Sequence, residues 1–288
     1  MEKRKWKIIE ALNWASSFLK TESNAPELLL AHLLQIDRAQ LFLRLREPCP
    51  DGVLQRFQAQ IAQHKQGVPI QYLIGEEQFF GRSFFVNEAV LIPRPETEEL
   101  VQAVLEKIRG RFQHKQRLAG CDVGTGSGAI AVTLACEEKS LAMTAIDISE
   151  EALAVAKQNA ERLKVNNIAF FQGDLLQPAI SQNKRFDVIV SNPPYIETDA
   201  IPALDISVRG YEPIVALDGG KDGCDVYRKM IAQLPSVVNE QALIGFEVGA
   251  GQSETVADLL REQLPDAQVE IIFDLNQKDR IVMAEVGF

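Results

Sequence analysis

The tetrapeptide Asn192-Pro193-Pro194-Tyr195 follows directly after a β-branched run at residues 188–191. The run predicts a buried parallel strand, and the prolines end it because neither can donate a hydrogen bond to a sheet ladder. Each proline also fixes its own φ and restricts the residue before it, so the chain leaves the strand in one stiff shape. In an open α/β sheet, ligands bind at this carboxyl end of the strands.

A stiff Asn-Pro pair at such an edge can hold a planar nitrogen. The side-chain oxygen of Asn192 and the carbonyl of Pro193 are neighbouring acceptors, whereas an NH2 group offers a pair of donors. Together the acceptors can hold an amide or amino nitrogen by both hydrogens, so that its face points at an electrophile. Tyr195 would add a flat wall beside it. The structural alternative is a proline-rich turn, because Asn-Pro is also common in turns.

A glycine loop and two strand-end acids indicate what the electrophile belongs to. Gly124-x-Gly126-x-Gly128 lies between a predicted strand and a predicted helix, where glycines let the backbone turn tightly and approach a ligand. Asp147 ends the next strand and can accept both hydroxyls of a ribose. Asp174 follows the strand after that and can accept a hydrogen bond from an exocyclic amine such as adenine N6. Singly, each acid is equally well explained as a helix cap or turn residue, but together they predict a nucleoside cofactor.

The elements that position these residues alternate between strand and helix after Gly120. Strands are expected at residues 121–123, 141–146, 168–171, 186–191 and 242–248, and helices at residues 129–135, 150–163 and 254–263. Residues 269–273 and 281–286 are joined without a helix and should form an antiparallel pair. Such alternation predicts an α/β fold with a parallel sheet and helices on both faces.

The first part of the chain has a different pattern. Residues 1–75 carry apolar residues at helical spacing and predict a small bundle of short helices, one opened by Pro26 and two capped by Asp37 and Asp51. Their leucine-rich stripes are expected to form the core of the bundle. Phenylalanine-rich strands of a hairpin are expected within residues 76–92, before a proline-rich linker. We therefore expect a helical domain at 1–75, a hairpin and linker at 76–95 and a catalytic domain at 96–288.

Composition restricts the possible partners. The chain has 288 residues, a net charge of −10 and a pI of about 5.0, which disfavours nonspecific coating of nucleic acid. Its four cysteines lack C-x-x-C spacing and its three histidines are dispersed, so we expect free thiols and no metal site. We find no signal-peptide pattern and no apolar run of membrane-spanning length, and expect a cytoplasmic protein without membrane contact.

The order of these motifs resembles the class I S-adenosylmethionine-dependent methyltransferases, which have a Rossmann-like seven-stranded sheet with an antiparallel final pair. Asn-Pro-Pro-Tyr resembles the motif of enzymes that methylate planar nitrogens. The chain further resembles the HemK/PrmC family of release-factor glutamine N5-methyltransferases. The segments that carry this resemblance are residues 71–75, 79–81, 91–98, 122–131, 187–195 and 209–213.

The resemblance implies S-adenosyl-L-methionine as the cofactor and class I peptide chain release factors as substrates, methylated at the glutamine of their Gly-Gly-Gln motif. We expect the protein to be a monomer and, because of its acidic charge, to make no direct contact with nucleic acid. It implies that the methionine part of the cofactor is lined by Gly124, Thr125, Gly126, Ser127 and Gly128. It implies that Asp147 holds the ribose, and that Asp174 and Leu175 flank the adenine. Leu175 replaces an aromatic residue of some members, which predicts weaker stacking on the adenine.

The resemblance also assigns the substrate site. Asn192, Pro193, Pro194 and Tyr195 would hold the glutamine amide, with Asn192, Pro193 and Tyr195 as the catalytic residues and Asn192 also beside the cofactor. No strong base is required before attack, because the proton can leave afterwards. Glu98 and Glu212 are candidates for shaping the negative potential of the site.

Three other functions remain open at this point. The same acceptor pair could hold an exocyclic amine of adenine or cytosine in nucleic acid, although the acidic charge argues against it. A glutamine in a ribosomal protein is a second possible substrate. A cofactor-binding regulator is a third possibility, but such a protein has no need of an amide clamp.

Overall fold

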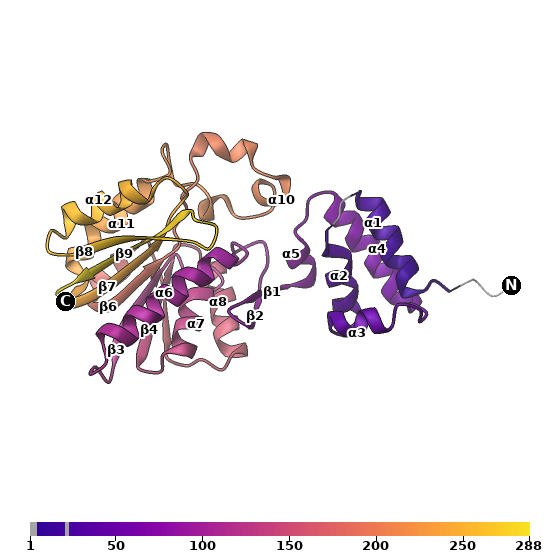
Figure 1. The fold of residues 1–288 in the computed structure, drawn as a ribbon, viewed down its shortest axis with the longest axis horizontal. Coiled ribbons are helices and arrows are strands. Elements are labelled where there is room, and N and C mark those ends of the chain that lie inside the picture. Colours follow the sequence, from indigo (N-terminus) through magenta and orange to yellow (C-terminus); the bar gives the residue numbers. More distant parts are fainter. Residues whose placement is uncertain (1–4, 21–22) are drawn as a thin grey trace. The chain divides into compact units, whose positions relative to one another are not determined.

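The computed structural model describes residues 5–20 and 23–288. They divide into two compact units, shown in Figure 1. The first unit runs to Gly75 and also contains Ile206–Tyr211, whereas the second comprises Glu76–Asp205 and Glu212–Phe288. The hairpin expected within residues 76–92 therefore packs as part of the second unit.

The first unit is a helical bundle. Its helices are α1 (Ile8–Leu19), α2 (Ala25–Leu34), α3 (Arg38–Leu43), α4 (Asp51–Lys65), α5 (Ile70–Ile74) and α10 (Ile206–Arg209). The leucine-rich stripes form its core as predicted, around fully buried side chains such as Leu29, Leu30 and Phe57. The cap of α3 is also confirmed, because the Asp37 carboxylate accepts a hydrogen bond from the Gln40 backbone at 2.7 Å.

Three details of this unit differ from the sequence prediction. Asp51 lies in the first turn of α4 and Pro50 is its N-cap, so the predicted Asp51 cap is wrong. The short helix α5 was not predicted, and it is delimited by Pro69 before it and by Gly75 in the left-handed conformation after it. Helix α10 was not predicted and belongs to this unit although it lies outside residues 1–75, and its packing is close: a Cβ added at Gly67 would lie 2.9 Å from the Ile206 side chain.

The second unit is built on a seven-stranded sheet with the strand order β5-β4-β3-β6-β7-β9-β8. The strands are β3 (Leu118–Val123), β4 (Leu141–Asp147), β5 (Ile168–Gln172), β6 (Phe186–Ser191), β7 (Val238–Glu247), β8 (Gln268–Phe273) and β9 (Asp279–Val286). β9 runs antiparallel to β7 and β8, and the other pairs are parallel. The α/β fold class, the Rossmann-like sheet and the antiparallel final pair are thereby confirmed.

Helices cover both faces of this sheet (Figure 1). One face carries α6 (Pro95–Arg111), α7 (Ala129–Glu137) and α8 (Glu150–Arg162), and the other carries α9 (Gln177–Ser181), α11 (Asp225–Gln233) and α12 (Ser253–Gln263). The remaining short 3-10 helices are η1 (Thr198–Ala203), η2 (Ile214–Ala216) and η3 (Leu234–Ser236).

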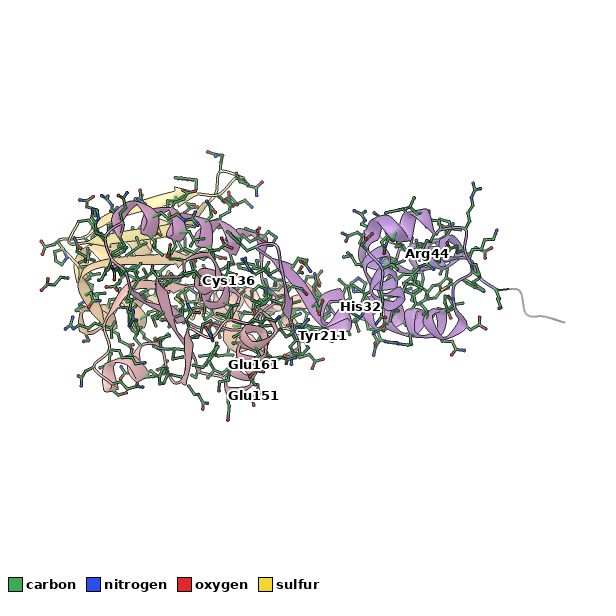
Figure 2. All side chains as sticks on the ribbon, turned by 90° about the horizontal axis from the view of Figure 1, so that it is seen from below. His32, Arg44, Cys136, Glu151, Glu161 and Tyr211 are labelled. Carbon is green, nitrogen blue, oxygen red and sulfur yellow. The ribbon has the colours of Figure 1, made fainter. Side chains whose placement is uncertain are left out.

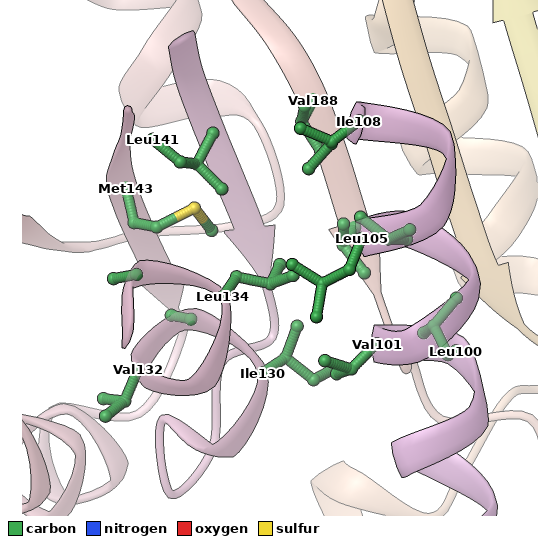
Figure 3. Packing of buried hydrophobic residues seen from close by; sticks show 14 of the residues in the cluster. Leu100, Val101, Leu105, Ile108, Ile130, Val132, Leu134, Leu141, Met143 and Val188 are labelled. Carbon is green, nitrogen blue, oxygen red and sulfur yellow. The ribbon is translucent and has the colours of Figure 1, made fainter. Parts of the chain in front are cut away.

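The alternation of side chains along each strand divides the core in two. Val188 and Val190 of β6 belong to the cluster under α6 and α7, whereas Ile189 belongs to the cluster on the opposite face. Figure 3 shows the first of these clusters, in which Leu105 of α6 and Leu134 of α7 point toward one another.

Helix α8 is amphipathic in the way its sequence predicts. Ser149 caps it, because its hydroxyl accepts a hydrogen bond from the Ala152 backbone at 3.1 Å. Glu151 and Glu161 lie on its exposed side (Figure 2), while Val155 and Ala156 are buried on the other. One face of α8 therefore packs in the protein interior, and the opposite face is exposed to solvent.

The predicted hairpin forms, but it is shorter than the segment assigned to it. Its strands are β1 (Glu76–Phe79) and β2 (Arg82–Phe85), joined by Phe80 and Gly81 with φ of 51° and 71°. Positive φ at both central residues is what a tight two-residue hairpin turn requires. Residues 86–92 form no strand, and instead Val90 and Ile92 are buried.

Within the described ranges, no helix is long and apolar enough to cross a membrane. The same ranges contain no cluster of histidine, cysteine and acidic side chains that could hold a metal ion. All four cysteines are free thiols, as expected.

One buried side chain joins the hairpin to the glycine loop. Asn159 of α8 is fully buried. Its amide nitrogen donates to the carbonyls of Phe85 and Ser127, both at 2.9 Å, and its oxygen accepts from the Phe85 backbone at 2.7 Å. The side chain thus satisfies three backbone groups on two separate segments.

Replacement of Asn159 by Ala should lower the free energy of unfolding by about 2–4 kcal/mol, because several buried backbone groups lose their partners together. Urea unfolding measures this loss. The matched control is Gln158→Ala, one position earlier on the same helix, where the side chain is exposed. Equal unfolding midpoints for the two variants would contradict the role of Asn159.

Candidate active site

A cavity of about 590 Å³ opens at the carboxyl ends of β3, β4 and β6. It brings together most of the residues that the sequence predicts for the site. The predicted residues that line it are Gly124, Thr125, Gly126, Ser127, Asp147, Asp174, Leu175, Asn192 and Pro194.

Three predicted residues lie beside the cavity but do not line it. Gly128 is the N-cap of α7, with φ of 80°. Pro193 is buried. Tyr195 is packed in the core cluster of the α11 and α12 face, and its backbone carbonyl accepts a hydrogen bond from Gln252 at 3.0 Å. Tyr195 is therefore held in place by the core cluster and by Gln252.

The glycines of the loop have two different reasons to be glycine. Gly124 and Gly126 have φ of 71° and 54°, and an added Cβ would meet nothing within 4 Å. Their constraint is the left-handed backbone conformation, which leaves the space in front of the loop open. At Gly128, by contrast, an added Cβ would lie 3.1 Å from the Ala156 side chain, so this glycine permits close packing of α7 against α8.

The buried Asp122 side chain supports the glycine loop through hydrogen bonds. It is fully buried, and its Oδ2 accepts hydrogen bonds from the Thr125 hydroxyl at 2.7 Å and the Ala131 backbone at 3.1 Å. Its other oxygen, Oδ1, has no hydrogen-bond partner. Burial raises the pKa of Asp122 to about 7, and the hydrogen bonds from Thr125 and Ala131 oppose this shift.

The Asp147 carboxylate holds the local backbone and can also accept hydrogen bonds from a ligand. Its Oδ2 accepts from the Gly126 backbone at 2.8 Å, and its Oδ1 accepts from the Ser149 backbone at 3.0 Å. Burial raises its pKa above the ordinary value. Each carboxylate oxygen retains further accepting capacity, so the same group can hold the loop and accept hydroxyl groups from the cavity.

The far wall of the cavity is apolar. Leu175 lines it with φ of 49°, a left-handed conformation that costs a non-glycine residue roughly 1–2 kcal/mol. Ile148, Ile214 and Val215 also line it and are 54%, 47% and 56% exposed. The sequence did not predict these three, which add apolar side chains to the cavity lining. Asp174 is exposed at the same end.

The substrate end of the cavity contains a hydrogen-bond chain that the sequence did not predict. The Asn192 side-chain nitrogen donates to the Thr97 hydroxyl at 3.0 Å, and that hydroxyl donates to Glu247 at 2.6 Å. Thr97 lies in the first turn of α6. The available signal for Glu247 was its position at the carboxyl end of β7, which matches that of Asp147 on β4.

Glu98 and Glu212, the candidates for shaping the electrostatic potential of the site, each bind a nearby protein group. Glu98 accepts a hydrogen bond from the Phe80 backbone at 2.9 Å and so holds the hairpin turn. Glu212 is buried and forms an ion pair with Arg94 at 2.6 Å. Arg94 lines the cavity, so this ion pair fixes one part of its rim.

These residues fit an S-adenosylmethionine molecule. The cavity volume lies within the range typical of small-molecule sites. The lining combines open backbone at Gly124 and Gly126, acceptor oxygens on Asp147 and an apolar side chain at Leu175, which are the kinds of group that an amino acid, a ribose and a base require.

Comparison with known proteins places the chain among methyltransferases. Residues 10–75 match the PrmC N-terminal domain family, and residues 114–236 match a methyltransferase domain family. Two crystal structures share the fold: the hMettl16 catalytic domain in complex with MAT2A 3'UTR hairpin 6 (TM-score 0.56, 16% identity, 83% of this chain and 82% of that chain) and a methyltransferase from Pyrococcus furiosus (TM-score 0.51, 19% identity, 80% and 98%).

Curated relatives are similar over nearly the whole chain. The release factor glutamine methyltransferase of Bacillus subtilis (strain 168) is 48% identical over 96% of this chain and 97% of its own length. The proteins of the same name from Bacillus cereus and Enterococcus faecalis are 47% and 39% identical, each over 97% of this chain and 99% of their own length. The chain therefore belongs to the release factor glutamine methyltransferase family.

Proposed function

We propose that this protein transfers a methyl group from S-adenosyl-L-methionine to the side-chain amide nitrogen of the glutamine in the Gly-Gly-Gln motif of class I peptide chain release factors. The observation that carries the proposal is the position of Asn192 and Pro194 in the lining of the same cavity as the glycine loop and Asp147. Full-length similarity to release factor glutamine methyltransferases supports the substrate.

The cofactor supplies an electrophilic methyl group on a sulfonium when it is bound. In the proposed arrangement Gly124, Thr125, Gly126, Ser127 and Gly128 surround its amino-acid part, Asp147 accepts its ribose hydroxyls, and Asp174 and Leu175 flank its adenine. The negative charge of Asp147 makes its hydrogen bonds stronger than those of a neutral acceptor.

The protein's contribution to transfer is orientation and charge. The Asn192 side-chain oxygen and the Pro193 carbonyl accept the two hydrogens of the substrate amide. This raises the electron density on a nitrogen whose lone pair is otherwise delocalised. It also stabilises the positive charge that develops on that nitrogen as the N–C bond forms and the methyl group leaves the sulfonium sulfur. Pro194 and Tyr195 keep the loop in one shape. The nitrogen loses its proton to solvent after attack, so no base is needed beforehand.

The competing substrates have less support. The similarity to the hMettl16 catalytic domain, which was crystallised with an RNA hairpin, is at 16% identity and concerns the fold alone. The net charge of −10 argues against direct nucleic-acid binding. We also propose that the protein is a cytoplasmic monomer that acts on a soluble protein substrate, with no membrane partner.

The direct test of the function is incubation of the purified protein with labelled S-adenosylmethionine and purified release factors, followed by peptide mapping. Label in the Gly-Gly-Gln peptide is the expected result. Label in a ribosomal protein or in nucleic acid, offered in the same incubation, would refute the proposed substrate.

Asp147→Ala should weaken cofactor binding by about 2–4 kcal/mol, because a charged acceptor for the ribose hydroxyls is lost. Isothermal calorimetry measures the dissociation constant. Glu151→Ala is the matched control, since it removes one exposed carboxylate from the neighbouring helix without reaching the cavity. Unchanged affinity in a folded Asp147 variant would mean that this acid only holds the loop.

Asn192→Ala should retain cofactor binding and reduce turnover about a hundredfold or more, the scale expected when an orienting and charge-stabilising contact is lost. A methyl-transfer assay and calorimetry separate the two properties. Asn166→Ala, an exposed position just before β5 and away from the cavity lining, controls for asparagine replacement as such. Near-normal turnover in the Asn192 variant would refute the amide clamp.

The helical unit is proposed to dock the intact release factor. A Gly-Gly-Gln loop alone offers few contacts, so affinity for a whole factor has to come from additional surface. Deletion of residues 1–75 should therefore lower kcat/KM on the intact factor and change it little on a short glutamine peptide. Calorimetric cofactor binding verifies that the second unit is intact. An equal loss on both substrates would mean that the helical unit stabilises the catalytic fold instead.

A further inference from the structure

Beneath the Asn-Pro-Pro-Tyr loop, three polar side chains from distant parts of the sequence form a single chain of hydrogen bonds. Glu247 at the end of β7 is 2% exposed and Thr97 at the start of α6 is 5% exposed. The Thr97 hydroxyl lies 2.6 Å from Glu247 Oε2, and the Asn192 nitrogen Nδ2 lies 3.0 Å from the Thr97 hydroxyl. Thr97 and Glu247 are both buried, so their polar atoms need hydrogen-bond partners.

The chemistry of the three groups forces the direction of every bond. An ionised carboxylate accepts hydrogen bonds and cannot donate them. The Thr97 hydroxyl has one hydrogen, and it is used in donating to Glu247. Toward Asn192 the same hydroxyl can therefore only accept. The NH2 end of the Asn192 amide must then face Thr97, and its carbonyl oxygen points away from it.

That orientation determines what Asn192 can hold. Asn192 lines the cavity, and the two ends of its amide have opposite hydrogen-bonding character. With the oxygen presented, the side chain accepts a hydrogen from a substrate NH2 group. With the amide turned over, it would present two hydrogens to another NH2 group, and the amide clamp would repel its substrate.

We propose that Thr97 and Glu247 are positioning residues for methyl transfer: they fix the rotation of the Asn192 amide so that its oxygen faces the substrate nitrogen. This inference rests on the proposed function, because it concerns the same acceptor pair. Neither residue needs to contact the substrate or the methyl donor. Their effect belongs in kcat, since a turned amide changes the group presented to the substrate nitrogen and leaves the glycine loop, Asp147 and Leu175 unchanged.

The surroundings of Glu247 make this orientation sensitive to pH. Burial raises the pKa of Glu247 to about 7, and hydrogen bonds from Thr97 and Asn192 with the positive charge of Arg280 oppose the shift. The other ionisable groups facing it are Glu96 from α6, Tyr195 from the loop after β6 and Tyr227 from α11. Burial raises the pKa of both tyrosines, so they remain neutral where Glu247 titrates.

Protonation of Glu247 removes the directional constraint. A protonated carboxyl can donate to the Thr97 oxygen, which frees the threonine hydrogen to donate toward Asn192. The side-chain amide of Asn192 can then rotate so that its NH2 end faces away from Thr97. The kcat should therefore be highest well above pH 7, where Glu247 is ionised, and should fall as the pH drops through the Glu247 pKa of about 7.

The molecule supplies its own control. Asp122 is a second buried carboxyl that accepts from a threonine hydroxyl, Thr125, and burial also raises its pKa to about 7. It supports the glycine loop and has no contact with Asn192 among its hydrogen bonds. Its titration should change the affinity for S-adenosylmethionine, whereas that of Glu247 should change kcat.

The experiment compares full-length wild type with Thr97→Val, Thr97→Ser, Glu247→Gln and Asp122→Asn. The assay is methyl transfer to an intact release factor between about pH 5.5 and about pH 9, with kcat and the KM for S-adenosylmethionine obtained at each pH. Circular dichroism verifies that each variant is folded, and calorimetry measures its affinity for S-adenosylmethionine.

Thr97→Val should lower kcat about tenfold to a hundredfold with unchanged cofactor affinity, and Thr97→Ser should restore it because serine keeps the hydroxyl. The amide in Glu247→Gln can either accept from Thr97 or donate to it, so it does not enforce the direction of the bond, and it cannot titrate. Its kcat should be lower than that of the wild type and should lose the fall near pH 7. Asp122→Asn should keep that fall in kcat and alter only the KM for the cofactor.

Wild-type kcat in a cofactor-binding Thr97→Val variant would overturn the positioning role. If that variant does not fold, an undiminished acid fall of kcat in Glu247→Gln, or its loss in Asp122→Asn, overturns the role equally well. If the wild type itself transfers no methyl group to the release factor, the proposed function is refuted and the positioning role falls with it.

Discussion

The site depends on one constraint, the register of four neighbouring parallel strands. Val123 of β3 pairs with Ile146 of β4 and with Ser191 of β6, and Ser191 pairs with Phe246 of β7. The residues that come one position later are Gly124, Asp147, Asn192 and Glu247. They therefore form a single row across the carboxyl edge of the sheet. A shift of any one strand by a single residue would turn its member of the row to the other face.

The row explains why so much of the site could be predicted without a structure. A short apolar strand that is followed by a glycine, an acid or Asn-Pro is a local pattern, and parallel strands align their carboxyl ends. Gly124, Asp147 and Asn192 were found in this way. Glu247 occupies the same position on β7 but was passed over, because its partner Thr97 is 150 residues away in the chain and no local pattern links the two.

The other features that the sequence did not predict also depend on contacts between distant parts of the chain. Ile206–Tyr211 packs with the helical unit through close contacts at Gly67, which a linear reading of the loop after Asn-Pro-Pro-Tyr cannot detect. The apolar run at Val90–Ile92 has strand character but no strand to pair with, so it is buried as an irregular segment beside the cavity. Ile214 and Val215 line the cavity from a 3-10 turn, an element without a periodic signature.

Asn159 has a consequence for how the second unit responds to its ligand. The same side chain satisfies the backbone of β2 and of the glycine loop, so ordering one segment favours the order of the other. Coupling of this kind is reciprocal in free energy. Whatever tightens the loop around a cofactor also protects the hairpin amides from hydrogen exchange, and any loosening of the hairpin weakens the hold on the cofactor. The hairpin is thus a thermodynamic part of the binding site although none of its strand residues lines the cavity.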